Sequence, residues 1–229
     1  MTTIPQRVQQ VRARIAAACA NAQRGVEEVT LLAVSKTFGA GAVREAAACG
    51  QVAFGENYLQ EAVEKMALLA DLPLEWHCIG PIQSNKTRLV ATHFQWAHTV
   101  DRLKIAQRLS EQRPEGLAPL NVCVQVNIDG GANKSGVAPG EALALAREVA
   151  RLPNLRLRGL MAIPEPVEGF EAQRAVHGRT RALFEELRRA GLPLDTLSMG
   201  MTGDLEAAIA AGSTMVRVGT AIFGGRAYA

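Results

Sequence analysis

Aromatic residues, paired cysteines and long apolar runs are all scarce in this sequence of 229 residues. Phe, Trp and Tyr make up 4% of the chain and the net charge is only +3, so we expect neither the stacking platforms nor the basic surface of a nucleic-acid-binding protein. No apolar run approaches the roughly 20 residues that cross a bilayer, so we expect no membrane segment. The hydrophobic content of 48% is typical of a globular protein with a sizeable core.

The spacing of cysteine and histidine excludes two further classes of site. The four cysteines are widely separated and include no C-x-x-C pair, which favours buried thiols in a reducing compartment over a disulfide framework. The four histidines show neither H-x-x-x-H nor H-x-x-E-H spacing, so no metal site is predicted. Residues 1–26 lack acids, as transit peptides do, but Val8, Val11 and Ile15 fall at the spacing of an amphipathic helix. We therefore expect a cytoplasmic protein.

Short apolar runs alternate with longer segments of helical composition along the whole chain. The predicted strands are Val29–Ser35, Val52–Phe54, Leu74–Ile79, Trp96–Thr99, Leu120–Asn127, Leu155–Ala162, Thr196–Met199 and Thr214–Val218. The predicted helices between them are Ala40–Cys49, Tyr58–Leu69, Asn85–Ala91, Leu103–Glu111, Gly140–Arg151, Gly169–Ala190 and Leu205–Ala211. Strands that alternate with helices pair in parallel, and eight such units predict an α/β fold, a (β/α)8 TIM barrel with an extra N-terminal helix. We expect one domain over residues 1–229. An open doubly wound sheet is the alternative, but no Gly-x-Gly-x-x-Gly follows the first strand.

Lys36 stands out because only five of the 25 basic residues are lysines. It follows the apolar run Leu31–Ser35, at the carboxyl end of the first strand, where barrel enzymes place their functional groups. Apolar surroundings lower the pKa of an amine, as a lysine that forms Schiff bases requires. The alternative is a lysine whose stem packs on the strand while its ammonium reaches solvent.

The loops after the last two strands suggest an anion site. Ser198–Asp204 is rich in hydroxyls and glycines and precedes the helix Leu205–Ala211, and Gly219-Thr220 follows the eighth strand. Loops at these two positions often bind phosphate in such barrels. The charge of Asp204 would repel a phosphate, but as an N-terminal cap it would stabilise its helix instead. Each loop taken alone could also be a capped turn.

Arg217 alternates with valines in the run Met215–Gly219, which places its side chain toward the barrel interior. A guanidinium there needs either a structural carboxylate or a ligand atom as its partner. An amine, a phosphate cradle and an interior arginine together fit a phosphorylated aldehyde, and pyridoxal 5′-phosphate (PLP) is the obvious candidate. A cation at its ring nitrogen would make the ring a weak electron sink, which argues against transamination.

Seven motifs, in order along nearly the whole chain, resemble those of a known family. They are VSKT at 34–37, FGENYLQE at 54–61, WHCIGPIQSNK at 76–86, NKSG at 133–136, LMAIP at 160–164, LSMGM at 197–201 and VRVGTAIFG at 216–224. The sequence resembles the pyridoxal phosphate homeostasis protein family (YggS/PROSC type). The resemblance implies a fold-type III barrel, like the N-terminal domain of alanine racemase, with PLP held as a Schiff base (internal aldimine) on Lys36. It also implies Asn57 beside the ring, Arg217 at the ring nitrogen, and Ser198, Gly219 and Thr220 at the phosphate. The predicted cofactor-binding residues are Lys36, Asn57, Ser198, Gly200, Arg217, Gly219 and Thr220.

The family is regarded as a carrier and regulator of vitamin B6 vitamers without an established catalytic activity, so we expect PLP buffering and delivery and predict no catalytic residue. Racemases of this fold carry a second domain with a tyrosine acid/base, and we expect none here, because the predicted eighth strand is followed only by a short tail. The two tyrosines are Tyr58, which is expected to begin a helix behind the second strand, and Tyr228, which could fold over the mouth. The alternatives are a racemase of low activity, a Schiff-base aldolase for a sugar phosphate, and a partner-binding scaffold. The expected partners are PLP and PLP-dependent apoenzymes, and we expect a monomer.

Other residues carry weaker expectations. Glu56, His77, Gln83, Asn85 and Lys86 could line the mouth of the barrel or simply cap strand ends. The loop Asp129–Gly136 contains Lys134 and could act as a lid or supply a transient amine for cofactor exchange. The alternative is a solvated loop.

Overall fold

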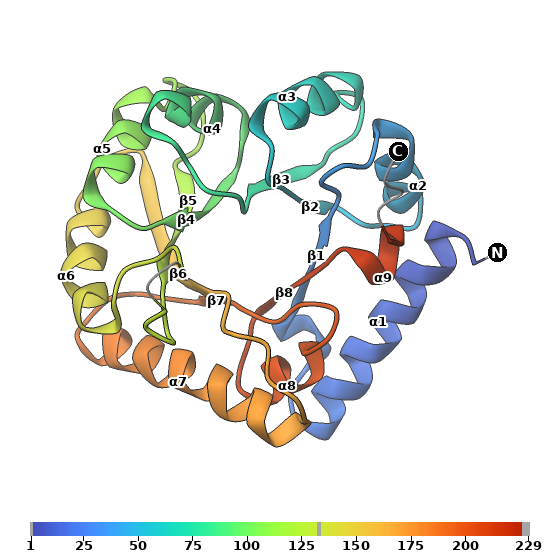
Figure 1. Cartoon of the computed structure of the whole chain (residues 1–229). Helices are drawn as coiled ribbons and strands as arrows, with labels where there is room; N and C mark the ends of the chain where they lie inside the picture. Colours follow the sequence, from blue (N-terminus) through green and yellow to red (C-terminus); the bar gives the residue numbers. More distant parts are fainter. Residues whose placement is uncertain (1, 132–133, 226–229) are drawn as a thin grey trace.

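The computed structural model describes residues 2–131 and 134–225. Its centre is a closed barrel of eight parallel strands in sequence order, seen along the barrel axis in Figure 1. The strands are β1 (Thr30–Val34), β2 (Ala53–Glu56), β3 (Glu75–Cys78), β4 (Trp96–Val100), β5 (Leu120–Val126), β6 (Leu155–Ala162), β7 (Thr196–Ser198) and β8 (Met215–Val218). Pairing of β1 with β8 closes the barrel, with Leu32 opposite Arg217. The predicted TIM barrel is confirmed.

Helices surround the barrel on its outer side (Figure 1). They are α1 (Ile4–Asn21), α2 (Ala40–Ala48), α3 (Leu59–Leu68), α4 (Thr87–His93), α5 (Leu103–Gln112), α6 (Pro139–Ala150), α7 (Phe170–Arg189), α8 (Leu205–Ala210) and α9 (Thr220–Phe223), with short 3-10 turns η1 (Val26–Glu28) and η2 (Ser84–Lys86). The predicted helix Asn85–Ala91 is divided between η2 and α4, and α9 follows the eighth strand where only a loop was expected. None of the helices in the described ranges is both long enough and apolar enough to cross a membrane.

The N-terminal helix α1 covers the side of the barrel where the chain closes on itself. A capping box between Thr3 and Gln6 starts the helix, and Val8, Val11 and Ile15 are buried on one face, as their spacing predicts. The helix lies beside α8 and α9 (Figure 1), so the first helix packs against the last ones. It therefore supports the loops that follow β7 and β8.

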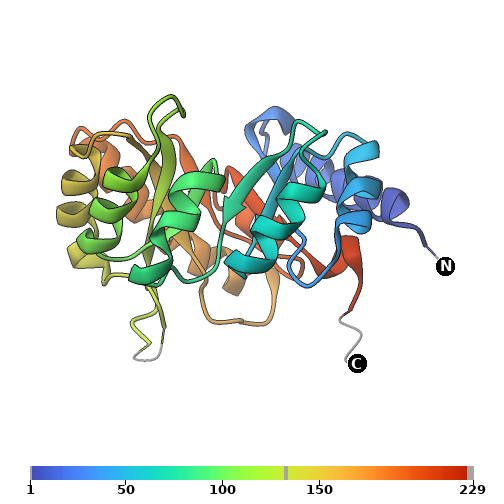
Figure 2. The ribbon, with the colours of Figure 1, turned by 90° about the horizontal axis from the view of Figure 1, so that it is seen from above.

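Side chains alternate between the barrel interior and the layer of helices. Leu32, Ala53 and Met215 form a small cluster inside the barrel with Ile79, while the large apolar core lies between the strands and the helices. Seen from the side, the loops after β5 and β6 extend beyond the same edge of the barrel (Figure 2). This edge holds the carboxyl ends of the strands and is called the mouth below.

Candidate functional site

The predicted cofactor-binding residues come together at one sector of the mouth. Lys36 follows β1, Asn57 follows β2, Gly200 follows β7, and Gly219 and Thr220 follow β8. These four strands are consecutive neighbours in the closed barrel, in the order β7, β8, β1, β2. The structure therefore brings together, at one edge, residues that are up to 184 positions apart in the sequence (36 and 220).

Lys36 continues the alternation of β1 onto the inner side of the barrel, and its side chain is half-buried. The preceding residue, Ser35, is buried and faces outward, where its hydroxyl donates to Oε1 of Glu56 at 2.6 Å. On the other side Thr37 has φ +68°, which is strained for a β-branched residue, and its N–H donates to Oε1 of Glu61 at 3.0 Å. Hydrogen bonds therefore fix the backbone on both sides of Lys36.

Lys65 of α3 is at the centre of the cluster that makes these contacts. Its Nζ donates to Oε1 of Glu56 at 2.6 Å, to the carbonyl of Ser35 at 2.9 Å and to Oε1 of Glu61 at 3.2 Å. The side chain of Lys65 is 3% exposed and that of Glu56 is fully buried. Burial raises the pKa of Glu56, and the ammonium of Lys65 opposes that rise. Lys65 was not predicted from the sequence, although it shares its helix face with the buried Leu59 and Ala62.

Glu56 was expected to line the mouth or cap a strand end, and the structure places it in this outer cluster instead. Because successive side chains of β2 alternate, Glu56 faces the helices and Asn57 faces inward. Asn57 has a buried Oδ1 with no hydrogen-bond partner among the described residues. A Cβ at Gly80 would lie 2.5 Å from the carbonyl oxygen of Asn57, so the glycine lets β3 approach this point closely. A buried acceptor without a partner suits a ligand that donates a hydrogen bond.

Arg217 lies inside the barrel, as its alternation with valines predicts, and is 4% exposed. Its Nη1 donates to Oγ of Ser198 at 2.8 Å, and its Nη2 donates to the carbonyl of Ala162 at 3.0 Å. Burial lowers the pKa of Arg217 to about 10. The expected alternatives were a carboxylate or a ligand atom, but within the described residues the guanidinium is held by a hydroxyl and a carbonyl. Two hydrogen bonds leave several of its five N–H donors for a ligand.

Ser198 was predicted at the phosphate. Its hydroxyl is fully buried and lies inside the barrel, 2.8 Å from Nη1 of Arg217 and 2.9 Å from Nδ1 of His98. A contact between Ser198 and a phosphate stays a prediction. His98 was not identified from the sequence, because it lies in mid-strand on β4 and belongs to no motif.

The loops after β7 and β8 meet at the mouth, as the predicted anion site in these loops requires. Oγ1 of Thr220 donates to Oγ1 of Thr202 at 3.2 Å, which joins the two loops. Arg14 of α1 donates to the carbonyl of Thr202 at 2.9 Å and forms an ion pair with Glu206 at 2.8 Å. The first turns of α8 and α9 leave N–H groups without intrahelical partners beside these hydroxyls.

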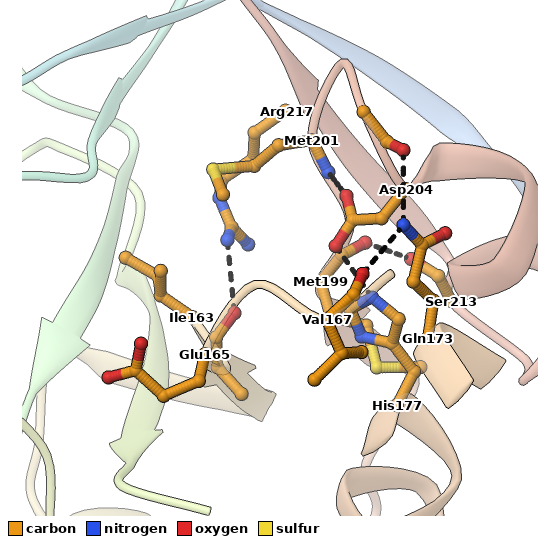
Figure 3. Close-up of polar contacts among 12 residues, drawn as sticks. Ile163, Glu165, Val167, Gln173, His177, Met199, Met201, Asp204, Ser213 and Arg217 are labelled. Atoms are coloured by element: carbon orange, nitrogen blue, oxygen red, sulfur yellow. Dashed lines mark hydrogen bonds and ion pairs between the residues drawn. The ribbon is translucent and has the colours of Figure 1, made fainter. Parts of the chain in front are cut away.

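The expectation that Asp204 caps α8 with its side chain is wrong. Asp204 occupies the N-terminal cap position, but its carboxylate accepts from the N–H of Met201 at 2.6 Å and from Nε2 of His177 at 2.9 Å (Figure 3). The imidazole of α7 provides a stronger partner than the first-turn amides. Burial alone would raise the pKa of Asp204, but the hydrogen bonds from His177 and Met201 outweigh burial and lower it.

A cavity of about 260 Å³ opens between α7 and the loops after β6 and β7. Pro164, Val167, Gln173, His177, Met201 and Asp204 are among its lining residues, and most of them are drawn in Figure 3. Of the loop after β7 it includes Met201, Gly203 and Asp204, and neither Gly219 nor Thr220 is among its lining residues.

Lys134 connects two loops at the mouth. Its Nζ lies 3.4 Å from Oδ2 of Asp129, 3.1 Å from Oε1 of Glu165 and 3.1 Å from the carbonyl oxygen of Ile163. These contacts join Lys134 to the loop after β6. Residues 132 and 133 of the loop Asp129–Gly136 lie outside the described residues, and its role as a lid or in cofactor exchange stays a prediction, as does the alternative of a solvated loop.

The other weak candidates lie away from this sector. Gln83, Asn85 and Lys86 are exposed in and before η2, and His77 lies inside the barrel. Tyr58 is exposed just before α3, and Tyr228 falls outside the described residues.

Comparison with known proteins supports one family over the whole chain. The family model "Alanine racemase, N-terminal domain" matches residues 8–227. A pyridoxal phosphate homeostasis protein of Pseudomonas aeruginosa is 64% identical over 228 residues, covering 100% of this chain and 98% of its own. The protein of that name from Escherichia coli is 54% identical over 231 residues, covering 100% and 99%.

Among solved structures, PipY of Synechococcus elongatus is similar both without and with PLP bound. The form without PLP has a TM-score of 0.86 at 38% identity and covers 97% of this chain and 100% of its own. The form with PLP bound has a TM-score of 0.80 at 38% identity, covering 92% and 100%.

Proposed function

Because the chain belongs to the pyridoxal phosphate homeostasis protein family, within the alanine racemase N-terminal domain fold, we propose that it binds PLP at the mouth of the barrel and buffers and delivers the cofactor. The observation that carries the proposal is the position of Lys36, an amine on the inner side of the mouth between the buried acceptor of Asn57 and the loops of β7 and β8. A 38% identical relative with PLP bound supports it.

The residues present fit the cofactor group by group. Lys36 offers the amine that attaches to an aldehyde, and Asn57 offers an acceptor that has no other partner in the described chain. Gly200, Gly219 and Thr220, with the backbone after Ser198, offer amides and hydroxyls to a phosphate. Arg217 offers N–H donors to an unprotonated ring nitrogen. When bound, PLP supplies an electron-withdrawing ring, and a cation beside its nitrogen weakens that property.

We further propose that holding PLP, rather than catalysis, is the role of this site. Racemisation requires proton carriers on both faces of the substrate carbon. Tyr58 is 51% exposed and lies before α3, outside the barrel, so it is not placed to oppose Lys36. The relatives from Pseudomonas aeruginosa and Escherichia coli are named pyridoxal phosphate homeostasis proteins, which supports the same conclusion. PLP-dependent apoenzymes are the proposed recipients, and we propose a monomeric cytoplasmic carrier.

The test is spectroscopic, with one lysine removed at a time. Protein incubated with PLP and desalted is expected to keep a visible absorption band, and borohydride treatment followed by peptide mass mapping is expected to place the adduct on Lys36. Lys36→Ala should lose the band, whereas the control Lys104→Ala, at an exposed position of α5, should keep it. A wild-type protein that retains no PLP, or a Lys36→Ala variant with the full band, contradicts the proposal. Solvent deuterium entering Cα of alanine with useful turnover would support the racemase instead.

A further inference from the structure

A chain of hydrogen bonds crosses the barrel interior from the edge opposite the mouth to Arg217. Oε1 of Glu75 lies 2.9 Å from Nε2 of His77, and Nδ1 of His77 lies 2.9 Å from Nε2 of His98. Nδ1 of His98 lies 2.9 Å from Oγ of Ser198, which accepts from Nη1 of Arg217 at 2.8 Å. The residues come from β3, β4, β7 and β8, so the chain links strands on opposite sides of the barrel.

The two ends of this chain determine the direction of every hydrogen bond in it. An arginine can only donate, so Oγ of Ser198 accepts from Arg217 and its own proton is left to donate to Nδ1 of His98. An ionised carboxylate can only accept, so Nε2 of His77 carries a proton and donates to Glu75. If His77 is neutral, its Nδ1 is then the acceptor for a proton on Nε2 of His98. Two neutral imidazoles in this arrangement are therefore both protonated on Nε2.

The surroundings of the two rings favour this arrangement. His77 and His98 are both fully buried, and desolvation lowers the pKa of each. The hydrogen bond from His77 lowers the pKa of Glu75, so its carboxyl stays ionised at neutral pH. The ring of His77 stacks on Trp96 with centroids 5.2 Å apart and an interplanar angle of 9°, which holds the imidazole in place.

Glu75 lies at the opposite edge of the barrel from Lys36. It is the first residue of β3, and its side chain is 44% exposed, whereas the other four residues of the hydrogen-bond chain are buried. In the order Arg217, Ser198, His98, His77, Glu75, each group donates to the next, so the chain joins a buried cation to a partly solvated anion. Arg217 has no ion-pair partner in the described residues, although the charge of Asp204 acts on it without direct contact. The hydrogen-bond chain connects it to a second carboxylate, that of Glu75.

We propose that Glu75, His77 and His98 are positioning residues: they direct the hydroxyl proton of Ser198 toward His98, so that Oγ presents a lone pair to Arg217. They thereby couple the edge of the barrel opposite the mouth to the cofactor ring. The coupling to the ring rests on the proposed function, whereas the direction of the chain does not. Replacing Glu75 by glutamine keeps the size of the side chain but offers both a donor and an acceptor to His77. The direction of the chain is then no longer determined, and Nδ1–H of His98 can compete with Arg217 for Oγ of Ser198.

The first measurement uses the protein without PLP. Long-range ¹H–¹⁵N NMR spectra of the imidazoles are expected to show His77 and His98 neutral, each protonated on Nε2. A charged ring, or a proton on Nδ1 of either histidine, would overturn the proposed direction. In Glu75→Gln the nitrogen shifts of both rings should move toward a mixture of tautomers, while Glu115→Gln, at an exposed position before β5, should leave them unchanged.

The second measurement uses the loaded protein and reports on the ring. Glu75→Gln is expected to displace the visible band and to weaken PLP retention by about two- to thirtyfold, the range of coupling found along such networks, with its melting temperature close to that of the wild type. Unchanged band and retention in Glu75→Gln would overturn the coupling. If the wild type retains no PLP, the proposed function and the coupling both fail, and the NMR result still decides the direction of the chain.

Discussion

At the scale of single residues, the buried pair Lys65–Glu56 shows how the mouth is built at an energetic cost. Removing two charges from water is unfavourable, and only close contact and further hydrogen bonds compensate for it. The two side chains meet at 2.6 Å, and Lys65 also donates to the carbonyl of Ser35, the residue before Lys36. The pair therefore holds the backbone that carries the proposed attachment point.

Lys65→Met should destabilise the protein by about 3–5 kcal/mol at neutral pH, because it leaves the carboxylate of Glu56 buried without its partner. The pKa of Glu56 is already raised by burial, and without the ammonium it rises further. A folded-state pKa above the unfolded value disfavours folding above that pKa, so the loss should shrink as the pH falls through it. Urea denaturation at neutral and mildly acidic pH measures both effects.

The matched control is the double variant Lys65→Met with Glu56→Gln, which removes the stranded charge and should recover much of the loss. Equal losses for the single and double variants at every pH would show that packing, not charge, explains the effect.

At the scale of elements, the turn between β7 and α8 depends on one glycine. Gly200 has φ +93°, and a Cβ built there would lie 2.5 Å from Cβ of Ala208 in α8. Its carbonyl also accepts from the N–H of Arg217 at 2.9 Å, so the same residue sets the approach of α8 to the barrel and the position of β8.

Gly200→Ala should lower the free energy of unfolding by about 2–4 kcal/mol, since a strained φ and a steric overlap with α8 both oppose the alanine. PLP retention should fall with it, because α8 and the loop before it move. Gly203→Ala is the control in the same loop: its added Cβ meets nothing within 4 Å, so both quantities should stay near wild type. Similar losses in the two variants would contradict the role assigned to Gly200.

The barrel could be predicted from the sequence because its pattern is local. Alternation of apolar runs with helical segments located all eight strands, and the two-residue period placed Arg217 inside. Contacts that depend on tertiary structure could not be predicted in the same way. Lys65 needs β1 and β2 beside α3 before it has partners, and the carboxylate of Asp204 turns to His177 of α7, 27 positions earlier in the chain.

At the scale of the whole molecule, closure makes the first and last parts of the chain interdependent. The pairing of β1 with β8 and the packing of α1 on α8 and α9 join residues near 4–34 to residues near 205–223. The proposed PLP site uses β1, β2, β7 and β8, whereas both tryptophans, Trp76 and Trp96, lie in β3 and β4. The expectation of one domain can therefore be tested by asking whether binding at one side stabilises the other.

Saturation with PLP at about 100 times its dissociation constant should stabilise the folded state by about 2.7 kcal/mol and raise the melting temperature by roughly 5–10 °C. If the barrel unfolds as one unit, the midpoint from tryptophan fluorescence should rise by the same amount as the midpoint from far-UV circular dichroism. Midpoints, rather than amplitudes, are compared because PLP itself quenches tryptophan emission. Lys36→Ala should show a much smaller rise by both probes. A fluorescence midpoint that stays fixed while the dichroism midpoint rises would show that β3 and β4 unfold independently of the PLP site, and the chain would then contain more than one cooperative unit.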